Sequence, residues 1–257
     1  MCAPYDALPP IPPMAGAAVS HRRLVLDAED GNRFMAFAGL PDHPSGAGVV
    51  VLPDIRGLFR FYEEVALRLA EQGLTAVAID YFGRTAGTSE RDEDFPGRDH
   101  AARTTPEGVR MDVAAAVAWL RSDEGGGVAD VFTLGFCFGG AHSWLQAAGG
   151  HGLAGAIGFY GRPNRAGLSE DPGALQRAGE LRAPILALMG GADAAIPPDV
   201  VEAFDAALDE AGVEHEVVTY PGAPHSFFDR HFEEHAAASE DAWGRTLDFI
   251  DAHRSRA

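Results

Sequence analysis

The chain has 257 residues, of which 46% are hydrophobic and 23% are charged, a balance typical of one globular domain with a sizeable core. Its formal net charge of −18 disfavours binding to nucleic acid and to anionic lipid, because both need a basic surface. No apolar run approaches the ~20 residues of a membrane span, and the first residues lack the pattern of a secretory signal. The two cysteines, Cys2 and Cys137, are too few for a disulfide framework. We therefore expect a cytoplasmic monomer or homodimer without nucleic-acid or membrane partners.

The N-terminal part of the sequence divides into an arm and the start of a domain. Residues 1–20 contain five prolines and many alanines, which is typical of a flexible arm. We expect residues 21–257 to form a single domain. Its first part predicts a hairpin, a buried strand, a helix and a second buried strand, at 21–38, 48–52, 61–72 and 75–79.

The rest of the domain alternates helix and strand. The segment between Tyr81 and Thr105 is long, charged and aperiodic, as functional loops or lids are. Beyond it we expect strands at 131–134, 153–160, 184–189 and 216–220, and helices at 106–121, from the 135–140 turn to about 148, at 198–211 and at 239–252. Because the strands are almost wholly apolar, both faces of the sheet should be covered. The sequence predicts an α/β fold with a mostly parallel central sheet and helices on both faces.

A glycine-rich turn joins a predicted strand to a helix. Gly135-Phe-Cys-Phe-Gly139 has the spacing of the nucleophile elbow of α/β-hydrolases, in which small residues flank a strained nucleophile. Cys137 would then lie at a helix N-terminus, whose dipole favours a thiolate. The backbone N–H of Phe138 would be an oxyanion donor. The alternative is that Cys137 is a small buried hydrophobic residue, as free cysteines commonly are.

Two later loops hold the partners that such a nucleophile needs. Asp193 follows the strand predicted at 184–189, and His225 follows the strand predicted at 216–220. An acid and then a histidine after later strands is the chain order of the α/β-hydrolase triad. Alone, Asp193 would be an ordinary turn residue and His225 an ordinary loop residue. Together they favour nucleophilic catalysis by Cys137, with His225 as the base and Asp193 orienting its ring.

Five motifs resemble those of the dienelactone hydrolase family, the carboxymethylenebutenolidases and their relatives. They extend over most of the chain: Asp80-Tyr-Phe-Gly-Arg84, Gly135-Phe-Cys-Phe-Gly-Gly140, Phe159-Tyr-Gly161, Gly190-Gly-Ala-Asp193 and Gly222-Ala-Pro-His-Ser-Phe227. The resemblance implies an α/β-hydrolase that opens lactones or cleaves activated esters of small molecules. It assigns the reaction to a Cys137–Asp193–His225 triad and an acyl-thioester intermediate. It also implies that neither a metal nor an organic cofactor takes part.

The same resemblance adds two residues beside the nucleophile. The family has an acidic residue after its third strand that holds the thiol proton at rest, and Asp54 in Pro53-Asp-Ile-Arg-Gly57 matches it with a side chain one methylene shorter. The alignment also makes the backbone N–H of Ile55 the second oxyanion donor. The alternative is that Asp54 is a plain turn aspartate.

Substrate recognition is less defined. In family members that act on dienelactone, one arginine after the catalytic histidine and one in the lid hold the substrate carboxylate. Here Arg230 lies one position further on and follows an inserted acid, and Arg84 is one of four arginines in the lid. Ser226 and Tyr160 are further candidates for substrate contact, although Tyr160 is equally explained by core packing. An anionic dienelactone and an uncharged ester both stay open as substrates.

Two other functions need consideration. His231-Phe-Glu-Glu-His235 has the spacing of an inverted zinc-protease motif, but a solvated surface is the favoured interpretation of such a short match. A non-catalytic protein that binds a ligand or senses redox state through Cys137 would use the same scaffold. The acid–histidine pair disfavours it, because a sensor thiol needs no general base.

Overall fold

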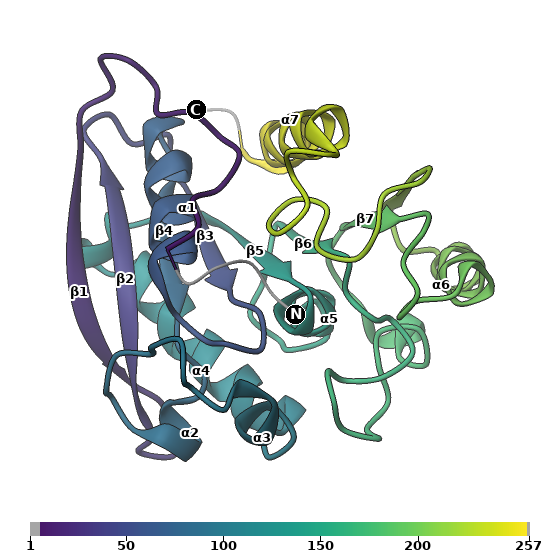
Figure 1. Ribbon diagram of the computed structural model, residues 1–257. Helices are drawn as coiled ribbons and strands as arrows, with labels where there is room; N and C mark the ends of the chain where they lie inside the picture. The colour runs from purple at the N-terminus through teal and green to yellow at the C-terminus, as the bar shows by residue number, and fades with distance from the viewer. Residues whose placement is uncertain (1–5, 256–257) are drawn as a thin grey trace.

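Residues 6–255, which the computed structural model describes, form one eight-stranded sheet with helices on both faces (Figure 1). The strands are β1 (Val19–Asp27), β2 (Arg33–Pro41), β3 (Ala47–Leu52), β4 (Thr75–Ile79), β5 (Asp130–Phe136), β6 (Gly155–Phe159), β7 (Ile185–Gly190) and β8 (His215–Tyr220). Their order across the sheet is β1-β2-β4-β3-β5-β6-β7-β8. Strand β2 is antiparallel to β1 and β4, and every other pair is parallel.

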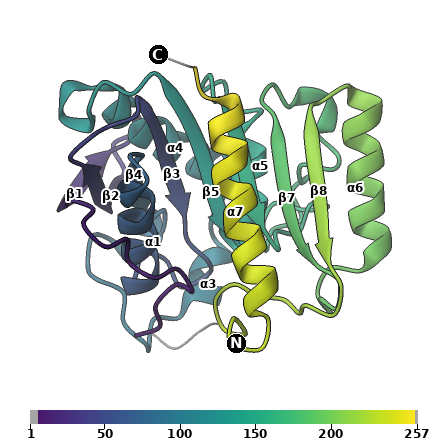
Figure 2. The ribbon, with the colours of Figure 1, turned by 90° about the horizontal axis from the view of Figure 1, so that it is seen from above.

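The helices divide between the two faces because side chains alternate along each strand. Alternate residues of β3 show this: Val49 and Val51 pack in one core with α1 and α7, and Val50 and Leu52 pack in another with α4. A third core joins α5 and α6 to β6 and β7. The long helices are α1 (Arg60–Glu71), α4 (Pro106–Arg121), α5 (Phe138–Gln146), α6 (Pro198–Ala211) and α7 (Ala236–His253). Figure 2 shows α7 lying across the sheet on the face that it shares with α1.

The predicted fold class is confirmed, with local differences. The helix expected at 61–72 runs one residue earlier, and α7 begins three residues before the predicted start. The lid segment is not free of structure: it holds the short helices α2 (Gly83–Ala86) and α3 (Gly97–Ala101). Two 3₁₀ turns, η1 (Asp123–Gly125) and η2 (Ala178–Glu180), were not expected. Periodicity does not detect elements this short, because they complete barely one turn.

The predicted N-terminal arm is partly described. Residues 6–18 contain no helix or strand, but β1 begins at Val19, inside the range assigned to the arm. Residues 1–5, which include Cys2, lie outside the described residues, so the flexibility of the arm stays a prediction. Within residues 6–255, no helix is both long enough and apolar enough to cross a bilayer.

The sheet brings distant loops to one edge. Strands β3, β5, β6, β7 and β8 are mutually parallel, so their carboxyl ends and the loops that follow share one edge of the sheet. Those loops contain Asp54, Cys137, Tyr160, Asp193 and His225 in that order. This arrangement places every predicted catalytic residue at the same edge.

Candidate active site

Cys137 lies between β5 and α5 in a backbone conformation that side chains rarely adopt, with φ 54° and ψ −111°. Its N–H donates to the carbonyl of Phe159 on the neighbouring strand, at 3.0 Å. Glycines make the turn possible: a Cβ at Gly135 would lie 2.0 Å from the carbonyl oxygen of Gly139, and one at Gly139 would lie 2.1 Å from that of Leu52. The thiol is therefore held at the first turn of α5, as the elbow spacing predicts.

Three side chains form one hydrogen-bonded chain. His225 Nε2 lies 3.1 Å from Cys137 Sγ, and His225 Nδ1 lies 2.6 Å from Asp193 Oδ2. Asp193 is buried, and its other oxygen accepts the N–H of Ala195 at 2.8 Å. The structure thus brings together the three residues predicted from chain order, in contacts that a triad requires. Their catalytic roles stay a prediction at this point.

The triad opens into a cavity of about 850 Å³. The cavity wall includes Cys137, Asp193 and His225, together with five further residues expected from the sequence: Ile55, Phe138, Tyr160, Ser226 and Arg230. It also includes three other arginines, Arg98, Arg162 and Arg165. Arg98 was one of the lid candidates that spacing does not distinguish, and the other two follow β6, just beyond the Phe159-Tyr-Gly161 motif, which does not include them. Their only signal in the sequence is their position after a strand end.

Asp54, which precedes the cavity residue Ile55, is buried and has a partner that the sequence analysis did not assign. Arg56 Nη2 lies 3.1 Å from Asp54 Oδ2, and the Arg56 N–H donates to Oδ1 at 2.8 Å. The Arg56 guanidinium also lies 3.9 Å from the centre of the Phe59 ring. The acid is thus an ion-paired residue in the loop after β3. Proton exchange with the Cys137 thiol stays a prediction.

Asp229, the acid inserted before Arg230, belongs to a buried group next to the triad. The hydroxyl of Tyr160 donates to Asp229 Oδ2 at 3.0 Å, and the Tyr160 ring centre lies 5.1 Å from that of His225. Burial, helped by the negative charge of Asp54, raises the pKa of Asp229 to about 6. Asp229 therefore fixes a wall of the site, a role that the sequence analysis missed because it treated the residue as a shift in spacing.

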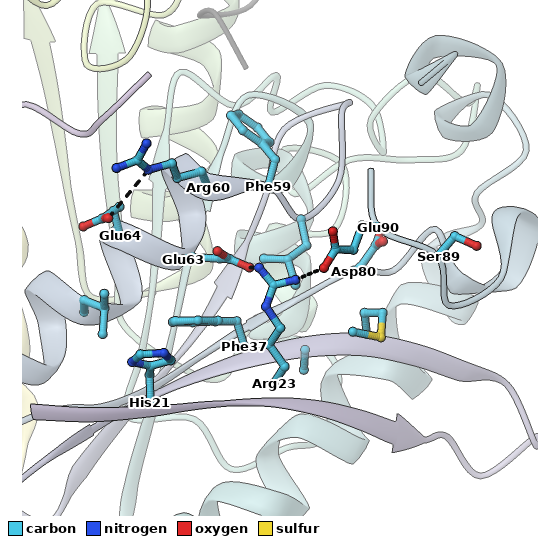
Figure 3. A pocket seen from close by; sticks show the side chains of 14 residues that line it. His21, Arg23, Phe37, Phe59, Arg60, Glu63, Glu64, Asp80, Ser89 and Glu90 are labelled. Carbon is cyan, nitrogen blue, oxygen red and sulfur yellow. Dashed lines mark hydrogen bonds and ion pairs between the residues drawn. The ribbon is translucent and has the colours of Figure 1, made fainter. Parts of the chain in front are cut away.

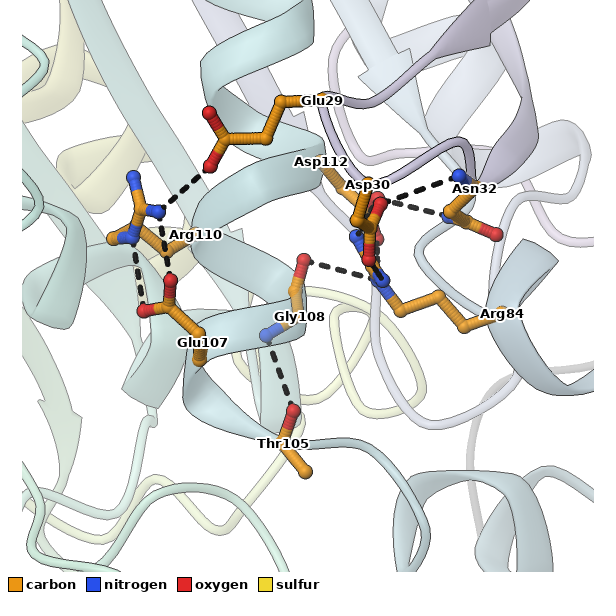
Figure 4. A network of polar contacts seen from close by, with 9 residues as sticks. All are labelled: Glu29, Asp30, Asn32, Arg84, Thr105, Glu107, Gly108, Arg110 and Asp112. Atoms are coloured by element: carbon orange, nitrogen blue, oxygen red, sulfur yellow. Dashed lines mark hydrogen bonds and ion pairs between the residues drawn. The ribbon is translucent and has the colours of Figure 1, made fainter.

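The structure places Arg84 among acidic partners and not at the wall of the active-site cavity. Its guanidinium pairs with Asp30 and, at 2.8 Å, with Asp112 Oδ1, and its Nε also donates to the carbonyl of Gly108 (Figure 4). Asp112 lies on α4 and is completely buried, so an unpaired charge there would be costly. Arg84 neutralises that charge and does not line the active-site cavity.

The His231–His235 motif does not form on a long helix. Residues 226–235 are turns, and α7 begins only at Ala236. His231 lines the active-site cavity, and His235 is the N-terminal flanking residue of α7. No group of three or more His, Cys, Asp or Glu side chains within residues 6–255 is arranged to hold a metal ion.

A second cavity, of about 450 Å³, lies between β1, β2, α1 and the start of the lid segment (Figure 3). Arg23 reaches from β1 into this cavity and pairs with Glu63 of α1, at 2.9 Å, and with Glu90 of the lid segment. Its wall includes His21 and Ser89, but no hydrogen bond joins these two side chains among the contacts of the described residues. The Arg23 contacts attach the lid segment to the sheet.

Comparison with known proteins agrees with this geometry. The sequence profile of the "Dienelactone hydrolase family" matches residues 34–254. The chain belongs to this family. It is 32% identical to a putative carboxymethylenebutenolidase of Escherichia coli K12, covering 86% of this chain and 83% of that protein. A similar protein of Yersinia pestis is 30% identical, over 87% of this chain and 85% of that protein.

Solved structures lead to the same family. The crystal structure of a putative dienelactone hydrolase from Klebsiella pneumoniae superimposes with a TM-score of 0.80 at 27% identity. The match covers 91% of this chain and 99% of that one. Membership in the family, together with the α/β-hydrolase fold, identifies the chain as a hydrolase.

The buried Asp229 should make stability depend on pH. Its folded pKa of about 6 exceeds the ~3.9 of an unfolded aspartate, so the folded state binds the proton more tightly. The free energy of unfolding of the wild-type protein should therefore fall relative to that of Asp229→Asn as the pH rises from about 4 to about 6. The fall should be up to ~1.4 kcal/mol for each unit by which the folded pKa of Asp229 exceeds its unfolded pKa. Urea unfolding at several pH values measures the difference, with the exposed Asp248→Asn as control. A pH-independent difference would contradict the assignment.

Removing Arg84 should affect stability and spare the active site. We expect Arg84→Met to lower the free energy of unfolding by about 3 kcal/mol, because Asp112 is left buried without its cation. Arg110, whose ion pairs within residues 6–255 are with the exposed Glu29 and Glu107, is the matched control, and Arg110→Met should cost less than ~1 kcal/mol. Chemical denaturation and kcat/KM are measured on the same samples. Loss of activity by folded Arg84→Met protein would restore a role in substrate binding.

Proposed function

We propose that the protein hydrolyses lactones or activated carboxylic esters with Cys137 as the nucleophile. The observation that carries the proposal is the unbroken chain of contacts from Cys137 through His225 to buried Asp193, at the wall of a large cavity. A neutral imidazole that donates to a carboxylate through Nδ1 presents a lone pair on Nε2. That lone pair faces the thiol at 3.1 Å.

The first half of the reaction forms an acyl-thioester. His225 Nε2 takes the thiol proton while Cys137 Sγ attacks the carbonyl carbon, and the carbonyl oxygen becomes an oxyanion. When the tetrahedral intermediate collapses, the bond between carbon and the alcohol oxygen breaks, and the imidazolium returns its proton to the leaving alkoxide. Asp193 stabilises the imidazolium throughout, because its carboxylate is fixed at 2.6 Å from Nδ1.

The second half uses water. His225 removes a proton from a water molecule, hydroxide attacks the thioester carbonyl, and the thiolate leaves to recover its proton. A lactone keeps its leaving oxygen tethered to the acyl group, which gives a second route: if the alkoxide leaves unprotonated, it takes the proton of the water in place of His225, and the imidazolium gives its proton to the departing thiolate. The backbone N–H groups of Phe138 and Ile55, both at the cavity wall, are the proposed oxyanion donors. Each such donor typically contributes ~3 kcal/mol to transition-state stabilisation.

The charge of the cavity supports a substrate with an anionic group. Four arginines line it, although the chain as a whole carries a net charge of −18. Arg98 forms no ion pair with any residue in the described range, and Arg162 donates to the backbone carbonyl of Ala195 rather than to an acid. Guanidinium groups without acidic partners recognise carboxylates well, because their paired N–H donors match the two oxygens. We infer that these two arginines, with Arg230, hold a substrate carboxylate.

A cytoplasmic location would keep the Cys137 thiol reduced, and it forms part of this proposal. The alternative function is a redox sensor or a ligand-binding protein on the same scaffold. It leaves the His225–Asp193 contact without a purpose, since a sensor thiol does not require an oriented general base.

Cys137→Ala should abolish turnover of 4-nitrophenyl acetate, with a loss in kcat of at least ~1,000-fold, because the attacking atom is gone. Stoichiometric iodoacetamide should inactivate the wild-type enzyme by alkylating Cys137, which peptide mass spectrometry locates. His225→Ala is the matched variant that keeps the thiol but removes its base, and it should lose most of the activity. Full turnover by Cys137→Ala, or by enzyme alkylated at that residue, would leave the sensor or binding function as the better account.

Neutralising a cavity arginine should change substrate selectivity. We expect Arg98→Gln and Arg162→Gln to lower kcat/KM for 4-nitrophenyl succinate by about 10-fold each, since each removes a charge-assisted contact with the carboxylate. Hydrolysis of the neutral 4-nitrophenyl butyrate should stay unchanged. Arg103→Gln is the control, because Arg103 lies in the same segment but not at the cavity wall. Equal losses on both esters would exclude a carboxylate site there.

A further inference from the structure

The loop between β3 and α1 is held firmly at its base. The N–H of Asp54 donates to the hydroxyl of Tyr62 at 3.0 Å, and the hydroxyl of Tyr81 donates to the carbonyl oxygens of Pro53 and Asp54. All these groups are buried. These contacts fix the chain before Ile55, but none of them reaches the Ile55 carbonyl at the tip of the loop.

The tip of this loop rests against the first residue of α3. A Cβ at Gly97 would lie 1.8 Å from the Ile55 carbonyl oxygen, 2.8 Å from its carbon and 3.2 Å from Arg56 Cα. Separations this short mean that the backbone of Gly97 itself touches the peptide that follows Ile55. Only glycine permits this approach, so α3 acts as a support behind the loop.

The other side of the loop is closed by a buried ion pair. Gly57, with φ +77°, packs against Asp80 and Arg91, since a Cβ there would lie 2.9 Å from Asp80 Oδ1 and 3.4 Å from Arg91 Cγ. Arg91 Nε lies 2.7 Å from Asp80 Oδ2, and both side chains are almost completely buried. Arg91 also lies over the ring of Phe95, 4.8 Å from its centre, just before α3 begins. One ion pair thus contacts the loop and anchors the helix that supports it.

We propose that Gly97 and the Asp80–Arg91 pair are positioning residues that hold the Ile55 N–H in its place in the oxyanion hole. The inference rests on the proposed function, because it assumes that Ile55 is an oxyanion donor. It assigns a purpose to the lid segment beyond forming a cavity wall. Since Arg98 adjoins Gly97, a substrate carboxylate bound by Arg98 contacts the same support that positions Ile55.

Gly97→Ala tests the proposal with one added methyl group. Either α3 or the Ile55 peptide must move, so kcat for 4-nitrophenyl acetate should fall by about 10-fold or more, while KM stays the same. Alkylation of Cys137 by iodoacetamide develops no oxyanion and should keep its wild-type rate. Gly244→Ala is the control, because a Cβ at Gly244 meets nothing within 4 Å. It should leave both rates unchanged.

Asp80→Asn provides a second variant in case Gly97→Ala does not fold. It keeps the side-chain volume and the acceptor for the N–H of Phe82 but removes the charge that holds Arg91. We again expect slower turnover of 4-nitrophenyl acetate and an unchanged rate of Cys137 alkylation. Unchanged turnover in either folded variant would overturn the proposal, and so would a parallel fall in turnover and alkylation, since that places the damage at the triad. Wild-type protein that neither turns over ester nor reacts at Cys137 would instead refute the proposed function.

Discussion

The close approach of α5 to the ends of β3, β5 and β6 is the constraint on which the active site depends. A side chain at Gly135, Gly139 or Gly140 would collide with neighbouring backbone at 2.0 to 2.7 Å. Because none of these three positions has a side chain, α5 can begin directly at the carboxyl edge of the sheet. The strained backbone of Cys137 is the local cost of that packing. This packing places the Cys137 thiol at the N-terminus of α5, where it contacts His225 Nε2.

Around the triad lies a second layer of buried polar groups. Asp54 pairs with Arg56, and Asp229 accepts a hydrogen bond from the hydroxyl of Tyr160, whose ring lies beside His225. The two carboxylates are close enough for the charge of Asp54 to raise the pKa of Asp229. In the resemblance to dienelactone hydrolases, Arg230 lies one position further on because Asp229 is inserted before it. Two buried carboxylates thus lie close to the chain of contacts that joins Cys137, His225 and Asp193.

The triad could be predicted from sequence because each of its residues follows a strongly apolar strand, and parallel strands place their following loops together. Arg84 could not be assigned in the same way. Its partner Asp112 lies 28 residues later on a helix, and nothing local shows that this acid is buried. The cavity arginines were also hard to assign: Arg98 lies on the short helix α3 and was one of several lid candidates, and Arg162 and Arg165 lie in a loop without periodicity. Tertiary packing, rather than local pattern, decides which arginine meets an acid and which meets the cavity.

The contrast between an acidic chain and a cavity lined by arginines has a kinetic consequence. At physiological ionic strength, mobile ions screen charges beyond about 8 Å. The net charge of −18 therefore has little effect on a distant anion under that condition. At low salt the same charge repels an anionic molecule over a longer range and slows its encounter with the protein. Inside the cavity the arginines are within contact distance, where screening has little effect. Association of an anionic substrate should therefore become faster as salt is first added, the reverse of the usual behaviour of oppositely charged partners.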